Sequence, residues 1–190
     1  MAASDVAICN LALQKLGAER IVSLTQDHPN ARHCNVAFAP TRNKLLRRYA
    51  WSFAKARASL AAHATAPAFD FDYAYPVPTD FMRLILPPNE VDWIVERHQG
   101  RRAILSNDTG PLEIRYIATV EDPTEFDPLF DDALAAALAW QMCEAITQSN
   151  TKKADLVEEF KEGIRVARQM NAFEVLPAEA VEDPWIAARR

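Results

Sequence analysis

Glycine is scarce in this sequence: Gly17, Gly100, Gly110 and Gly163 are the only four among 190 residues. A phosphate-binding loop or a dinucleotide-binding fingerprint requires several glycines within a few residues, because the backbone must approach the phosphate closely. No two of these glycines have that spacing, and the Gly-x-Ser-x-Gly motif of serine hydrolases does not occur. The sequence therefore contains no nucleotide-binding loop and no serine nucleophile elbow.

Cysteine and histidine are also few: the sequence has three cysteines and four histidines. Cys9, Cys34 and Cys143 are far apart and have apolar neighbours, which favours buried free thiols in a reducing compartment. A Cys–His nucleophile pair stays open, because such partners can be distant in the chain, but a reactive thiol requires an electropositive, partly exposed position. The nearest group to a metal site is His28, His33 and Cys34, and positions five residues apart do not share a helix face. We therefore expect no metal, no cofactor and no catalytic residue.

Long apolar runs are missing as well. The longest, from Ala133 to Trp140, is far shorter than the roughly 20 residues that a membrane span requires. The N-terminal MAASDVAICN carries an acid where the positive region of a signal peptide would lie. The apolar fraction of 49% and the charged fraction of 25% are typical of a globular protein. We expect a protein that is made in the cytoplasm and does not enter a membrane.

Charge is unevenly distributed along a chain whose net charge is −5. No acid lies between Asp27 and Asp70, and this basic stretch, 32–57, holds Arg32, Arg42, Lys44, Arg47, Arg48, Lys55 and Arg57. The segment 121–132 is acidic and holds Glu121, Asp122, Glu125, Asp127, Asp131 and Asp132. Two interpretations stay open: solvated helix surfaces, or surfaces that meet each other between copies or bind another charged partner. A pI near 5.4 argues against specific DNA binding.

Hydrophobic periodicity and capping residues predict helices over about 4–17, 28–50, 127–148 and 151–171. Pro40 lies inside the second helix, so we expect a kink or a break around residues 37–40. The stripes expected to face inward are Leu134, Leu138, Met142, Ala145 and Ile146 in the third helix and Leu156, Phe160, Ile164, Ala167 and Met170 in the fourth.

The middle of the chain, about 71–120, is rich in aromatic and β-branched residues and in turn dipeptides. This pattern predicts strands at Phe81–Leu86, Val91–Arg97, Arg101–Leu105 and Leu112–Val120, with hairpin turns at 98–100 and 107–110. The predicted fold class is α+β, mainly α: an antiparallel helical bundle with an inserted small antiparallel β-meander and an extended C-terminal tail. Residues 1–174 are expected to form a single domain. Residues 175–190, which include Trp185, are expected to form a docking tail, because they are too few to have a core of their own.

Three stretches carry a resemblance to a known family: residues 5–17 (DVAICNLALQKLG), residues 30–54 with Arg47-Arg48-Tyr49-Ala50-Trp51-Ser52-Phe53-Ala54 at their end, and Tyr75-Pro76 followed by Pro78-Thr79-Asp80-Phe81-Met82-Arg83-Leu84. Their order, with two helices after the β-region, resembles podophage tail tubular protein A, the head–tail adaptor. The resemblance covers residues 4 to about 173. Ala50 departs from the pattern, in which a proline is expected before the tryptophan.

The resemblance implies a structural virion protein of the phage tail, not an enzyme. It implies a ring of twelve copies between the portal protein and a tail nozzle of the tail tubular protein B type, with contacts to a tail fibre and with DNA as non-specific cargo in the channel. The candidate interface residues are Arg42, Arg47, Arg48, Trp51, Glu121, Asp122, Glu125 and Trp185. The alternatives are a protein-interaction scaffold unrelated to phage and a small helical enzyme.

Overall fold

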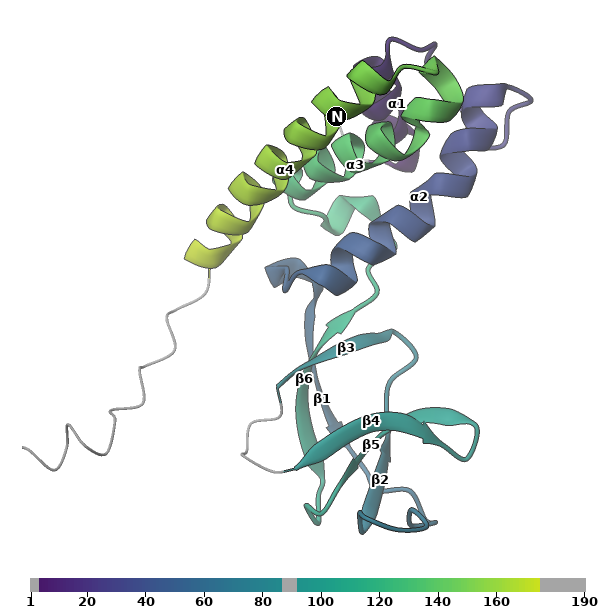
Figure 1. The fold of residues 1–190 in the computed structure, drawn as a ribbon. Helices are drawn as coiled ribbons and strands as arrows, with labels where there is room; N and C mark the ends of the chain where they lie inside the picture. Colours follow the sequence, from purple (N-terminus) through teal and green to yellow (C-terminus); the bar gives the residue numbers. More distant parts are fainter. Residues whose placement is uncertain (1–3, 87–91, 175–190) are drawn as a thin grey trace, which may run out of the picture.

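The computed structural model describes residues 4–86 and 92–174. Figure 1 shows the helices gathered at one end of the molecule and the strands at the other. The helices of the described ranges are α1 (Asp5–Leu16), α2 (Pro29–Arg48), α3 (Pro128–Thr147) and α4 (Asn150–Phe173), with short 3-10 helices η1 (Ser52–Ala54) and η2 (Pro123–Glu125). None of these helices is long and apolar enough to cross a lipid bilayer.

The third helix is the centre of the bundle. Every residue from Ala133 to Ala139 is buried, and α3 packs against α1, α2 and α4. A helix that is apolar on all sides is stable only when other elements surround it. The small alanine side chains allow the neighbouring helices to approach closely, so the alanine-rich sequence of α3 explains its central position.

Side-chain caps set the ends of the helices. The Ser4 hydroxyl accepts a hydrogen bond from the Ala7 amide, and Gly17 ends α1 in the left-handed conformation. The carboxylate of Asp127 caps α3, where Pro128 is the first helical residue, and Ser149 caps α4. These ends lie close to the predicted bounds.

Pro40 does not break α2, which runs from Pro29 to Arg48. The proline removes one amide donor and leaves the carbonyl of Val36 without its helical partner. Val36 is 75% exposed and Pro40 is also exposed, so water can bind that carbonyl. Of the two expected outcomes, a kink or a break, the break is excluded, because the proline lies on the solvent-exposed side of a continuous helix.

The strands are β1 (Lys55–Leu60), β2 (Tyr73–Pro76), β3 (Phe81–Leu86), β4 (Trp93–His98), β5 (Arg101–Ser106) and β6 (Leu112–Ala118). In the described ranges they form two antiparallel three-stranded sheets, in the orders β1-β6-β3 and β2-β5-β4. The predicted fold class, α+β and mainly α with antiparallel strands, is confirmed.

Two details of the β-region differ from the prediction. The region begins at Lys55, not near residue 71, because β1 pairs with β6 and its small and charged residues gave no apolar signal. Residues 107–110 are not a hairpin turn, since they lead from β5 in one sheet to β6 in the other. The turn at Gln99–Gly100 does join a hairpin, β4–β5, and both residues have the positive φ of a type I′ turn.

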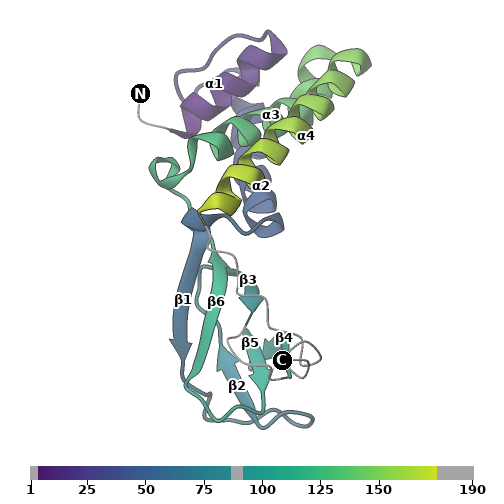
Figure 2. The ribbon, with the colours of Figure 1, turned by 90° about the vertical axis from the view of Figure 1, so that its left-hand side faces the viewer.

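Helices and strands have separate cores. Leu84, Ile114 and Tyr116 of one sheet pack against Tyr75 and Ile104 of the other, so the inner faces of the two sheets form the β core. The helical core is built around α3 and extends to Ile117, near the end of β6. Figure 2 shows how narrow the connection between the two parts is. We call this connection, residues 49–55 and 117–120, the junction.

The stripes predicted to face inward are largely buried, with two errors. Ala145 is exposed, and so is Met170, at 53%. Met170 lies near the end of α4, close to the junction, and Phe173 is 77% exposed there. Helical periodicity locates a buried face but does not show where the neighbouring helices end.

Substitution of Gly110 tests the tight passage between the sheets. Gly110 has φ +68°, and a Cβ there would lie 2.7 Å from the Tyr75 hydroxyl oxygen. We expect Gly110→Ala to lower the free energy of unfolding by about 1–3 kcal/mol in urea titrations. Gly163→Ala is the control: it lies in α4 with open space around it and should stabilise the chain by about 0.5–1 kcal/mol. Equal stability of Gly110→Ala and the wild type would contradict this account.

Candidate functional site

The candidate metal ligands and the cysteines were the groups in the sequence that most resembled a chemical site. No group of three or more His, Cys, Asp or Glu side chains in the described ranges has a geometry that would hold a metal ion. Cys9, Cys34 and Cys143 are fully buried. The hydrogen bond with Cys34, and after it burial, raise the pKa of the Cys9 thiol well above its ordinary value. A buried thiol with a raised pKa is a poor nucleophile.

Arg42 lies inside the folded chain rather than on an open surface. Its guanidinium donates to the Asn43 side chain at 3.0 Å and to the Glu121 backbone carbonyl at 3.4 Å. Its Nη2 lies 3.6 Å from Glu121 Oε1, and only 8% of its side chain is exposed. The basic stretch and the acidic segment therefore meet at this point within one chain. Arg42, a candidate for a contact between copies, therefore has its hydrogen-bond partners within its own chain, as a buried guanidinium requires.

Trp51 is also a core residue. It is 1% exposed, and its indole Nε1 donates to the Leu45 carbonyl at 3.1 Å. Its ring packs edge-on against Phe130, with the centroids 5.0 Å apart, and against Tyr49 at 5.8 Å. Trp51, expected at an interface, is therefore packed inside the junction in this structure.

Arg47 and Arg48 are both exposed at the end of α2, but they differ in their contacts. Arg47 donates to the backbone carbonyl of Met82 in β3 and so spans the junction. The guanidinium of Arg48 lies 5.5 Å from the centre of the Tyr49 ring. Among the described residues, no carboxylate forms an ion pair with either arginine.

The acidic segment is exposed where it surrounds η2. Asp122 accepts hydrogen bonds from the amide and the hydroxyl of Thr124, and these bonds lower the pKa of its carboxyl. Glu125 is exposed, and the Glu121 side chain is 79% exposed despite its contact with Arg42. These three acids remain available to a partner.

Two further carboxyls lie against the bundle. Burial, and then the neighbouring Asp132 and Asp127, raise the pKa of Asp131 to about 6. Burial also raises the pKa of Asp5, although nearby Arg42 opposes this. One oxygen of each carboxyl is buried without a hydrogen-bond partner. The acidic segment is thus partly a structural feature, held around Arg42, and partly an open surface.

A groove that the sequence did not predict runs between α2 and α4, with α3 as its floor. It has a volume of about 420 Å³. It is lined by Thr41, Lys44, Leu45 and Arg48 from α2, by Ala137, Trp140 and Gln141 from α3, and by Lys153 and Phe160 from α4. We call it the helical groove. Trp140 of the floor stacks on Phe160 of the α4 wall with the ring centroids 6.0 Å apart, and Trp140 is 39% exposed.

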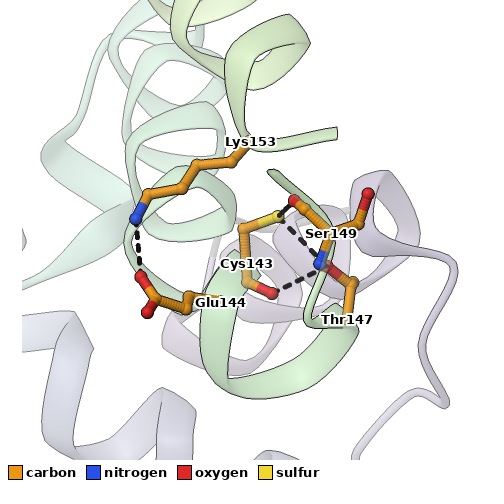
Figure 3. Close-up of polar contacts among 5 residues, drawn as sticks. All are labelled: Cys143, Glu144, Thr147, Ser149 and Lys153. Carbon is orange, nitrogen blue, oxygen red and sulfur yellow. Dashed lines mark hydrogen bonds and ion pairs between the residues drawn. The ribbon is translucent and has the colours of Figure 1, made fainter. Parts of the chain in front are cut away.

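The turn between α3 and α4 fixes one wall of this groove. Figure 3 shows Lys153 of α4 reaching Glu144 of α3, with Nζ 2.7 Å from Oε2. In the same turn, the Thr147 hydroxyl donates to the Cys143 carbonyl at 2.7 Å and accepts from the Ser149 amide at 3.3 Å. The charge of Lys153 is therefore shared with Glu144. Lys44 and Arg48, on the opposite wall, have no such partner among the described side chains.

Trp185 and the rest of the predicted docking tail, 175–190, lie outside the described residues. Comparison with known proteins adds no assignment: no protein-family model matches the chain, and no curated protein matches it.

Replacing Arg42 tests whether it acts within the chain. Arg42→Met should lower the free energy of unfolding by about 2 kcal/mol, because it removes charged hydrogen bonds and leaves Asp5 without its nearby cation. Arg101→Met, at an exposed position of β5, should change it by less than about 0.5 kcal/mol. If the two substitutions lowered the free energy of unfolding equally in urea titrations, the structural role of Arg42 within the chain would be contradicted.

Asp131 should make stability depend on pH. Its raised pKa means that the folded chain holds the proton more tightly than the unfolded chain, so its stabilising effect is complete below about pH 4 and is lost as the pH rises through about 6. Because the group is only half-buried, we expect the effect to be about 1 kcal/mol. Asp131→Asn should remove that part of the pH dependence in unfolding titrations at pH values across this range. Asp155→Asn, at an exposed site on α4, is the control and should leave the pH dependence unchanged.

Proposed function

We propose that this chain is a structural subunit of a phage tail, a head–tail adaptor of the tail tubular protein A type. In this proposal, twelve copies form a ring between the portal protein and the tail nozzle, and DNA passes through the ring. The protein acts by binding its neighbours and not by catalysing a reaction.

The observation that carries the proposal is the division of the fold. A bundle of long helices is joined through a narrow junction to a β-region that is inserted between α2 and α3 (Figure 1). The resemblance of residues 4–173 to the adaptor family implies this same order, a helical body with a β-insertion. Such a shape presents two distinct bodies to two partners, as a connector between portal and nozzle must.

The surfaces also support a binding role. Exposed acids surround η2, while Lys44 and Arg48 are exposed on α2 and Lys55 and Arg57 on β1. Large apolar side chains remain exposed on both bodies, including Trp140 on the helices and Trp93 on the strands. Aromatic side chains are common anchors of protein interfaces. A net charge of −5 limits sticking to DNA phosphates in the channel.

Assembly with the portal is the direct test. We expect the full chain, mixed with portal rings of the same phage, to add a twelve-membered ring that negative-stain images and the native mass reveal. A chain that stays monomeric alone is compatible with the proposal, since the portal then acts as the template. Failure to bind the portal, together with self-assembly or capture of unrelated proteins, would favour a scaffold outside the phage tail.

Charge reversal on η2 sharpens this test. Asp122→Lys with Glu125→Lys should weaken assembly on the portal while circular dichroism melting falls only slightly, because both side chains are exposed and the lost bonds to Thr124 close only one short 3-10 turn. The control is Asp155→Lys with Glu158→Lys, which changes the net charge equally on α4. If the two variants assembled equally well, the acids of η2 would not contribute to the contacts between subunits.

A further inference from the structure

The helical groove has the composition of a binding site for an acidic segment with a large apolar side chain. Trp140 on the floor and Phe160 on the α4 wall offer stacked rings, and the small side chain of Ala137 lies in the same groove. Its α2 wall offers Lys44 and Arg48, for which the described residues provide no ion-pair partner. An apolar floor bordered by cations fits a ligand with the opposite charge and an aromatic anchor.

The chain itself contains such a segment. Residues 175–190 carry Glu179, Glu182 and Asp183, followed directly by Pro184, Trp185 and Ile186. No lysine or arginine occurs between Arg168 and Arg189. The acids are adjacent to the tryptophan, as the cations of the groove are adjacent to its aromatic floor.

The segment is also long enough to reach the groove of its own subunit. Phe160 precedes the end of α4 at Phe173 by 13 residues, which is about 20 Å along a helix. Trp185 follows Glu174 by 11 residues, which span up to about 36 Å when extended. The attachment of the tail to a wall of the groove gives it a high effective concentration there, about millimolar for a short flexible connection.

We propose that residues 175–190 bind in the helical groove of the same chain, with Trp185 against Trp140 and Phe160 and with Glu182 and Asp183 beside Lys44 and Arg48. This contact covers the exposed part of α3 and neutralises the cations of α2. The inference does not depend on the adaptor function. If both hold, any partner that takes up the tail must first displace it from the groove.

Photo-crosslinking in the full chain tests the contact. We would replace Trp185 by p-benzoylphenylalanine, irradiate the protein over a range of concentrations, and locate the crosslink by peptide mass spectrometry. The expected product is a monomer whose crosslink joins position 185 to α2, α3 or α4 at the groove. A crosslink to any other part of the chain, crosslinked dimers, or no crosslink would overturn the proposal.

Charge reversal and its repair provide a second readout, the hydrogen-exchange protection of residues 175–190 with Trp185 in place. Lys44→Glu with Arg48→Glu should lower the protection roughly tenfold, because two favourable charge pairs become repulsive. Adding Glu182→Lys and Asp183→Lys should restore it. The control, Arg57→Glu with Arg101→Glu, makes the same change in net charge at exposed positions of the strands and should leave protection unchanged.

The two variants separate a specific contact from general electrostatics. Protection that falls equally in the groove variant and the control would overturn the proposal, and so would a wild-type tail that exchanges as fast as an unstructured peptide. Portal binding is not measured here, so either result leaves the adaptor proposal to its own test.

Discussion

The burial of Trp51 is the contact on which the rest of the molecule depends. Its indole donates to the Leu45 carbonyl at the end of α2, and its ring packs on Phe130 of α3. The chain enters β1 directly after η1, so this side chain sets where the β-region leaves the helices. Asn171 of α4 also stabilises this part of the junction, because its side-chain amide donates to the Ala50 carbonyl and accepts from the Ser52 amide. Three helices and the first strand are therefore fixed relative to one another around a single indole.

This arrangement decides which charges stay on the surface. The end of α2 is held against the junction, so Arg42 faces inward toward Glu121 while Arg47 reaches across to β3. A buried arginine is stable only when its donors are satisfied within the subunit, and the loop before η2 supplies the acceptors. The charge asymmetry of the sequence is thus used partly for folding. The charged surface that remains available to partners is therefore smaller than the sequence suggests. It consists of the acids of η2, the outer cations of α2 and the cations of β1.

Helices, caps and the fold class could be predicted because each has a local cause, such as Asp127 before Pro128 or the alanine run of α3. The long-range features could not. β1 consists of alternating small and charged residues, and only its pairing with β6 makes it a strand. Likewise, Trp51 and Arg42 looked like interface residues because they lie in a basic stretch, but burial depends on Phe130 and Glu121, which lie about 80 residues later in the chain. The helical groove is formed by side chains from three helices, so no local sequence pattern predicts it.

The groove is a consequence of how the bundle is built. A central helix that is apolar on all sides requires cover on all sides, yet α1, α2 and α4 leave the part of α3 around Trp140 open. Polar side chains line much of this opening, but Trp140 and Phe160 also stack there. Exposed aromatic surface is unfavourable in water, and with cations beside it this surface suits an acidic, apolar segment. The chain continues beyond α4 with a segment of that composition, so the sequence supplies both the opening and a cover that suits it.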